Sequence, residues 1–245
     1  MVEKSRKWTL FVGVLLIGVI ISAGCIGDTP TEEGEASQAA PVETSTATSG
    51  DGDTSLSDLL EKVKGTTSVK YDMVTTSPGV PSMTSKVWVD EGKMRMETAA
   101  DGHNMIMIMD GLEAYMYDPE ENRAIKMDFG NIPESAIEEI QSLMDYDPTV
   151  VGIETIDGKL CTVVEYTDSS EFMGESFEVK TKSWIWQKHG LPIRMESTSS
   201  EGDTTIIEMK NIDFGNIPDS MFELPAGAEV TDFQSMMESM LPTET

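Results

Sequence analysis

A run of histidine and methionine on alternate residues offers the most specific metal-binding chemistry in this sequence. His103, Met105, Met107 and Met109 would share one face of a strand, and imidazole with thioethers is a ligand set that suits Cu(I). The run is embedded in an apolar pattern, and His103 follows the turn at Asp101-Gly102, where water competes for its side chain. We therefore expect no metal ion and no cofactor, and copper is the alternative to be tested.

The other nucleophiles and bases do not form a recognisable catalytic set. Cys161 lies in the apolar run 160–164 and is expected to be a buried, unreactive thiol. His189 lies in a turn before Gly190, and the sequence has neither a Gly-x-Ser-x-Gly elbow nor a phosphate-binding loop. Carboxylates are so abundant that no pair of them stands out. We expect a protein that is not an enzyme.

The charge balance limits the partners of this chain of 245 residues. Its 44 Asp and Glu residues against 17 Lys and Arg residues give a net charge of −27. The first 24 residues carry a net +2 (Lys4, Arg6 and Lys7 against Glu3), so cleavage after Gly24 would leave −29. Such a body repels phosphate backbones and anionic headgroups, which argues against nucleic-acid binding.

The amino terminus has the parts of a signal peptide. Three basic residues precede the apolar run 8–21, which is short for a membrane-spanning helix, and Ser22-Ala23-Gly24-Cys25 follows. Small residues directly before a cysteine resemble the lipobox of prokaryotic lipoproteins, and this resemblance implies cleavage and lipidation at Cys25. The alternative is an uncleaved N-terminal anchor. Either way, we expect the body on the outer face of the cytoplasmic membrane.

Composition divides the rest of the chain into a tether and one domain. Residues 26–54 are rich in Thr, Ser, Glu, Gly and Pro and have almost no large apolar side chain, so they cannot form a core. A flexible tether of this length spans on the order of 30 Å. We expect a signal peptide at 1–24, a lipidated cysteine and tether at 25–54, and a domain at 55–245.

Acidic-Gly pairs separate short apolar runs throughout the expected domain, and such pairs are typical of hairpin turns. They predict eleven strands in sequential hairpins: 69–76, 85–90, 93–98, 105–109, 114–118, 124–129, 150–156, 160–167, 177–187, 193–197 and 204–212. We expect an α+β fold whose large antiparallel sheet is curled into an open half-barrel.

Three amphipathic helices are expected to cover the concave face of this sheet. The first begins at a capping box, Ser55 to Asp58, and ends at Gly65. The second is Glu134–Asp145, and the third is Thr231–Leu241, with a capping box from Thr231 to Gln234. The sequence Asp-Phe-Gly-Asn-Ile-Pro occurs at 128–133 and again at 213–218, which predicts two similar corners that launch covering segments.

The order of these elements resembles the LolA-like lipoprotein-carrier family. The resemblance covers about residues 55–230 and rests on the strand pair 86–90 and 93–97, the hairpin ending Tyr115-Met116-Tyr117-Asp118-Pro119, Ile156-Asp157-Gly158-Lys159, Trp184-Ile185-Trp186 before Gly190-Leu191-Pro192, and the ending 217–225. It implies an unclosed antiparallel barrel whose concave face, covered by helices, accepts acyl chains of lipids or lipoproteins. It also implies a second possibility, because relatives with this architecture act as sensor domains that bind proteins. A chain tethered through Cys25 differs from the soluble carriers, which diffuse between membranes.

The methionines point independently to an apolar ligand. Unbranched thioether side chains adapt to irregular guests, and they also fill gaps in ordinary cores, so both interpretations stay open. The candidate cavity residues are Met94, Met96, Met105, Met107, Met109, Trp184 and Trp186, and the candidate lid residues are Phe233, Met236, Met237 and Met240. We expect a lipid-anchored protein that binds an acyl or isoprenoid chain. The alternative is a cell-surface sensor or protein-interaction module whose interior is only a filled core, and no protein partner can be named.

Overall fold

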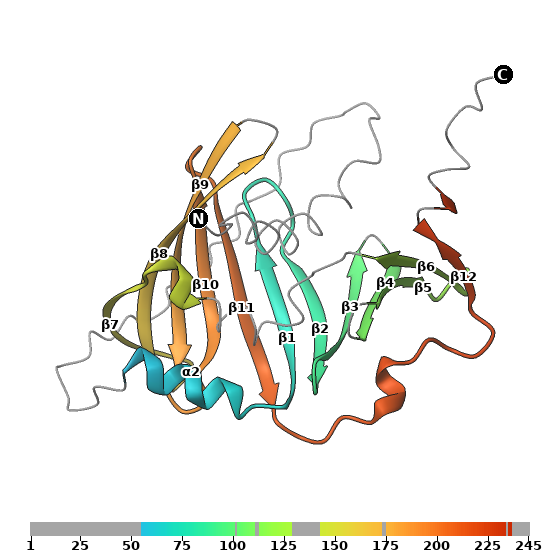
Figure 1. Cartoon of the computed structure of the whole chain (residues 1–245), viewed down its shortest axis with the longest axis horizontal. Coiled ribbons are helices and arrows are strands. Elements are labelled where there is room, and N and C mark those ends of the chain that lie inside the picture. Colours follow the sequence, from blue (N-terminus) through green and yellow to red (C-terminus); the bar gives the residue numbers. More distant parts are fainter. Residues whose placement is uncertain are drawn as a thin grey trace, which may run out of the picture.

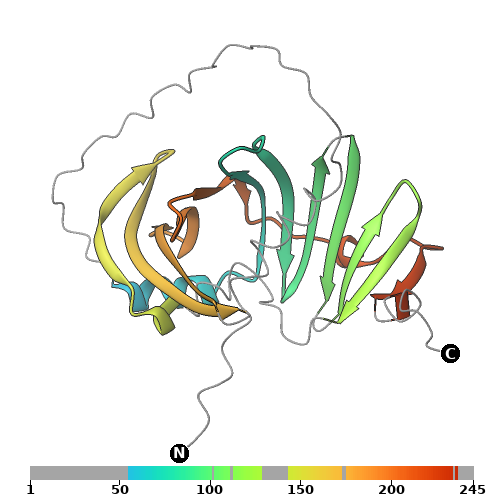
Figure 2. The same cartoon turned by 90° about the horizontal axis from the view of Figure 1, so that it is seen from above.

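Twelve strands form one sheet in the part of the chain that the computed structural model describes, residues 55–100, 102–110, 113–128, 143–172, 175–233 and 235–236 (Figure 1). Their order is β12-β6-β5-β4-β3-β2-β1-β11-β10-β9-β8-β7. The strands are β1 (Ser68–Thr76), β2 (Met83–Asp90), β3 (Lys93–Ala100), β4 (His103–Asp110), β5 (Glu113–Asp118), β6 (Arg123–Asp128), β7 (Thr149–Ile156), β8 (Lys159–Phe172), β9 (Glu175–Trp186), β10 (Leu191–Ser199), β11 (Thr204–Asp213) and β12 (Glu229–Asp232). The sheet is curled and unclosed, with β12 and β7 at its two edges (Figure 2).

The expected sequential hairpins are present within two halves of the sheet but not between them. Strands β1 to β6 form one meander and β7 to β11 another. The prediction that each strand pairs with the next is wrong at β6, because β6 pairs with β5 and β12 and lies far from β7. Instead β1 pairs with β11, with Met73 opposite Met209. Local turn signals carry no information about this long-range pairing.

Two of the acidic-Gly turns have the backbone conformation that the hairpin prediction requires, whereas at Glu201-Gly202 only the glycine has a positive φ. Glu91 and Gly92 have φ values of 47° and 83°, and Asp157 and Gly158 have φ values of 48° and 72°. Positive φ at both central residues matches the right-handed twist of the flanking strands. The turns at 91–92 and 157–158 are therefore confirmed.

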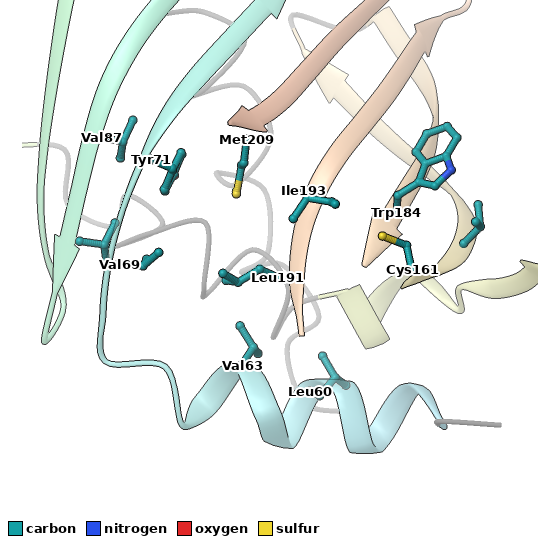
Figure 3. Packing of buried hydrophobic residues seen from close by; sticks show 12 residues of the cluster. Leu60, Val63, Val69, Tyr71, Val87, Cys161, Trp184, Leu191, Ile193 and Met209 are labelled. Carbon is teal, nitrogen blue, oxygen red and sulfur yellow. The ribbon is translucent and has the colours of Figure 1, made fainter. Parts of the chain in front are cut away.

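The first predicted helix is confirmed as α2 (Leu56–Lys64). Ser55 and Asp58 form the expected capping box, and Gly65 ends the helix. Leu60 and Val63 face Val69 and Leu191 in the main core cluster (Figure 3). Leu59 lies in a second cluster with Leu143, Val164, Tyr166 and Ile185. One apolar stripe thus attaches α2 to strands from both halves of the sheet.

The other two predicted helices are described only in part. Of Glu134–Asp145, residues 134–142 lie outside the described residues, and Leu143–Tyr146 form a 3-10 turn, η1. The predicted start of the third helix is wrong, because Thr231 belongs to β12, which runs parallel to β6. The capping acceptor is Asp232, whose Oδ1 accepts from the Ser235 backbone N–H at 3.1 Å. Residues 229–232 lie beside β6 and pair with its backbone as a strand. A helix prediction from sequence does not take such distant partners into account.

The second Asp-Phe-Gly corner covers one face of the sheet, as predicted. Asp213 ends β11 and accepts from the Gly215 N–H at 2.9 Å, and Pro218 precedes the 3-10 turn η2 (Asp219–Phe222). Ile217 and Phe222 are buried against Ile108 of β4. The first corner, apart from Asp128, lies outside the described residues.

The open curled sheet with α2 on its inner side confirms the expected α+β half-barrel. Within residues 55–236 as described, no helix is long and apolar enough to cross a membrane. The predicted signal peptide, Cys25 and the tether lie outside the described residues.

Candidate ligand-binding face

Cross-strand register places the methionines in rows on one face of the sheet, here called the inner face. It is the face that α2 covers, because Val69, Tyr71 and Val87 lie on it and cluster with the helix. The rows, read across neighbouring strands, are Tyr71, Val87, Met96, Met107, Met116 and Ile125; Val69, Val89, Met94, Met109, Ala114 and Met127; Met209, Met73, Ser85, Thr98 and Met105; and Val164, Ser183, Met195, Ile207, Thr75 and Met83.

None of the residues in these four rows is charged. The opposite, outer face carries the charges of the same strands. Arg194 lies 3.0 Å from Glu208, Lys210 lies 3.1 Å from Glu208 and 3.0 Å from Asp157, and Arg95 lies 2.8 Å from Glu97. Burial lowers and the carboxylates raise the pKa of Lys210, and the net direction is upward, so it stays protonated. Charge does occur on the inner face at one end of β5 and β6, where Asp118 lies opposite Arg123 beside Met116 and Ile125.

The predicted cavity methionines lie together on this face. Met107 and Met109 are buried with Ala114, and the partly buried Met94 and Met96 contact both this group and the main core cluster. Met105 is half-buried in the neighbouring row. Five predicted residues therefore form one thioether surface, which fits either a core or an adaptable ligand site.

The two predicted cavity tryptophans share the main core cluster with some of the methionines: Trp184 is a buried member of it, and Trp186, Met94 and Met96 pack against it. Trp184 lies opposite Arg194 next to the bulge in β10, and it is buried in the cluster that contains Leu60 and Val63 of α2. The Trp184 Nε1–H donates to Glu154 at 2.8 Å, and Lys182 Nζ lies 4.8 Å from its ring centre. Trp186 lies on the same side of β9 as Trp184, as the sequence predicts, and is half-buried.

His103, the histidine ligand of the alternative copper site, lies at the rim of the inner face, at the start of β4. Its side chain is 79% exposed, and its Nδ1 lies 3.3 Å from a Glu120 oxygen. Among the described residues, no three His, Cys, Asp or Glu side chains gather as a metal ion would require. Since Met105, Met107 and Met109 could still supply thioether ligands, titration of the full chain with Cu(I) is the test.

The predicted lid is described only at its beginning. Phe233 is 42% exposed, and Met236 is half-buried. Met237 and Met240 lie outside the described residues. The lid therefore stays a prediction.

Sequence reasoning missed a band of hydroxyl groups on the inner face. Ser85 bonds Thr98 at 2.7 Å, Thr181 bonds Ser197 at 3.1 Å, and Ser77 bonds Thr205 at 3.0 Å. The alternation of Thr181 and Ser183 in β9 is the period-2 signal that identifies it. Because these hydroxyls bond one another, the band adds neutral polar groups to the inner face without leaving them unpaired.

Cys161 is buried, as predicted, and burial raises the pKa of its thiol to about 12. The thiolate is therefore scarce at pH 8, so iodoacetamide is expected to leave Cys161 unmodified in the native protein and to modify it in urea. Mass spectrometry of the peptide that contains residue 161 measures this. Fast modification under native conditions would show that the β8 region opens readily.

Comparison with known proteins gives a likeness of fold. No family model matches the chain. An uncharacterized protein of Methanocaldococcus jannaschii is 26% identical over 154 residues, which are 57% of this chain and 41% of that protein. The chain thus spans less than half the length of this curated relative.

Among solved structures, an uncharacterized conserved protein of Thermus thermophilus has a TM-score of 0.52 and 11% identity, covering 72% of this chain and 98% of that chain. A LolA superfamily protein of Nitrosomonas europaea has a TM-score of 0.35 and 14% identity, covering 69% and 97%. The unclosed antiparallel barrel with a helix on its inner face is the architecture that the resemblance to the LolA-like family implies.

Proposed function

We propose that this protein is a membrane-anchored, extracytoplasmic lipoprotein that binds the acyl or isoprenoid chain of a lipid on its inner face. In this proposal a signal peptide ends at Gly24, Cys25 carries the anchor, and residues 26–54 tether the domain. It is a binding protein rather than an enzyme, and its role is the handling of lipids or lipoproteins near the membrane.

The apolar rows of the inner face carry this proposal. An aliphatic chain gains affinity from apolar contact and loses it wherever it desolvates a charge. The rows through Met94, Met96, Met107 and Met109 are apolar across four neighbouring strands, β2 to β5. Thioether side chains have several rotatable bonds and adjust to guests of different shape, which suits a mixture of lipid chains.

The second candidate is a sensor or protein-interaction module whose inner face is only a packed core. The burial of Met107 and Met109, both 4% exposed, favours it, because a filled interior leaves no room for a guest. The two functions differ in what the purified full chain retains. Mass spectrometry of its organic extract should find a lipid in the first case and none above background in the second.

A charge placed on the inner face should abolish binding of a fluorescent fatty acid. Met96→Glu puts a carboxylate between Val87 and Met107, and we expect the affinity to fall roughly tenfold or more, since each factor of ten is about 1.4 kcal/mol. Titration of the full chain with cis-parinaric acid, followed by its fluorescence, measures the change.

Ala99→Glu is the matched control. Ala99 lies in the same strand, is exposed and belongs to the outer face, so the same charge should leave the affinity unchanged. Equal loss in both variants, or no saturable binding by the unchanged chain, would contradict the proposal. Melting curves confirm that both variants fold.

A further inference from the structure

A pair of hydroxyl groups lies buried among the methionine rows of the inner face. Ser85 of β2 and Thr98 of β3 are 1% and 7% exposed, and their hydroxyl oxygens lie 2.7 Å apart. Both residues belong to the inner face, because Ser85 lies opposite Met73 and Thr98 lies opposite Met105. The pair adjoins four half-buried methionines on this face, Met73, Met83, Met96 and Met105.

The hydrogen bond between these two hydroxyls uses only one of their two hydrogens. Each hydroxyl has one hydrogen to donate, so when one of them donates to the other, the second hydrogen needs an acceptor elsewhere. Within the described part of the chain, neither the Ser85 nor the Thr98 hydroxyl bonds a third group. Thioether sulfur, which surrounds the pair, is a weak acceptor. The pair therefore keeps one buried O–H donor whose desolvation is uncompensated, and an oxygen atom of a ligand would satisfy it.

Charge on the inner face lies on only one side of the Ser85–Thr98 pair. In the described strands β2 to β6, the charged or ionisable residues of this face are at the strand ends away from α2: His103, Asp118 and Arg123. On the other side of the pair, toward α2 (Figure 1), the face continues through Val87 with Met96 and then Val89 with Met94. The pair thus stands where an apolar strip meets a polar rim, which is the arrangement that an amphiphilic ligand requires.

We infer that the Ser85–Thr98 pair binds the carbonyl oxygen of an acyl ester and so sets the class and the direction of the lipid. The inference rests on the proposed function and adds to it the group that is recognised. The free hydroxyl hydrogen donates to the ester carbonyl, the acyl chain runs past Met96 toward α2, and the head group lies toward Arg123. The adjoining methionines rotate to admit the ester. A hydrocarbon without oxygen leaves the hydrogen unsatisfied and binds more weakly.

Fluorescence titration of the full chain with two matched probes tests the inference. One probe is the methyl ester of pyrenedodecanoic acid, and the other is dodecylpyrene, which has the same ring and chain length but no ester. We expect the unchanged chain to bind the ester roughly fivefold more tightly, as one net hydrogen bond would. Ser85→Ala combined with Thr98→Val should remove this preference and leave the affinity for dodecylpyrene within about twofold.

Two control variants tie the preference to this pair. Thr198 and Thr204 also bond across neighbouring strands, at 2.9 Å, but they share the outer face with Glu196, so Thr198→Val combined with Thr204→Val should leave the preference for the ester unchanged. Thr98→Ser keeps a hydroxyl at the site and should keep the preference as well. Equal affinity of the unchanged chain for both probes would overturn the inference and leave lipid binding standing. No saturable binding of either probe would overturn the inference together with the proposed function.

Infrared spectroscopy of the bound ester, labelled with carbon-13 at its carbonyl, examines the hydrogen bond itself. The carbonyl stretching frequency should be lower in the unchanged chain than in hexane, because the carbonyl accepts a hydrogen bond. It should return toward the value in hexane when the ester is bound to the Ser85→Ala, Thr98→Val chain. Replacing both partners of a buried pair by apolar groups of similar shape is nearly neutral for stability, so this variant should melt close to the unchanged chain. A bound carbonyl that absorbs as it does in hexane in the unchanged chain would overturn the inference whether or not the variant folds.

Discussion

Replacing Gly190 by alanine should detach α2 from the sheet and lower the free energy of unfolding by about 3–5 kcal/mol. Gly190 has a φ of +72°, and a Cβ built on it would lie 2.2 Å from the Leu59 carbonyl oxygen and 2.9 Å from the Val63 nitrogen. Both are backbone atoms of α2, so no side chain can rotate away to make room. For a domain of this size, the melting temperature should fall by roughly 10 °C.

Gly158→Ala is the control for the strain of positive φ alone. Gly158 also has a φ of +72°, but its Cβ would meet nothing within 4 Å. It should cost about 1 kcal/mol, the usual penalty for a left-handed residue. Circular dichroism melts of the two variants isolate the steric part, and similar melting temperatures would mean that α2 is not held against this turn.

Phe222→Ala should lower the free energy of unfolding by about 3–5 kcal/mol. Phe222 is 4% exposed and, with Ile217, covers Ile108 on the outer face. The segment has further attachments, because Arg95 donates to the Met221 carbonyl at 3.0 Å. The truncation therefore leaves a cavity that the anchored segment cannot readily close.

Phe233→Ala is the matched comparison for the predicted lid. Phe233 is 42% exposed, so the same truncation should change stability by no more than about 0.5 kcal/mol. Urea denaturation of both variants measures the difference. If Phe233→Ala costs as much as Phe222→Ala, the segment after β12 belongs to the core, and its role as a displaceable lid is contradicted.

The parts of the fold that could be predicted from sequence are those set by neighbours in the chain. The capping box at Ser55 and Asp58 and the turns at 91–92 and 157–158 act over a few residues, and all are as expected. The β1–β11 pairing and the parallel strand β12 depend on residues far away, so local propensity does not reveal them.

The membership of the inner face could likewise be predicted only where it depends on neighbours in the chain. Alternation within β3 and β4 places Met94, Met96, Met105, Met107 and Met109 on a single side once β3 and β4 pair as a hairpin. Whether Trp184 joins them depends on the register of β9 with β10, where a bulge between Pro192 and Arg194 shifts the pairing. A one-residue shift exchanges the two faces of a strand, and the sequence does not mark where it occurs.

The pairing of β1 with β11 imposes an order on the formation of the sheet. Lys70 lies opposite Asp213, and almost the whole domain separates them along the chain, whereas β2 follows β1 after a short turn. Closing a loop of that length costs roughly 4 kcal/mol in chain entropy, against much less for a hairpin. Each meander can therefore form hairpin by hairpin from its own turns. Pairing of β1 with β11, which joins the two meanders, becomes favourable only after both have formed. Because α2 packs on strands from both meanders, we expect the helix to complete its contacts at the same time as β1 pairs with β11, in the last step of folding.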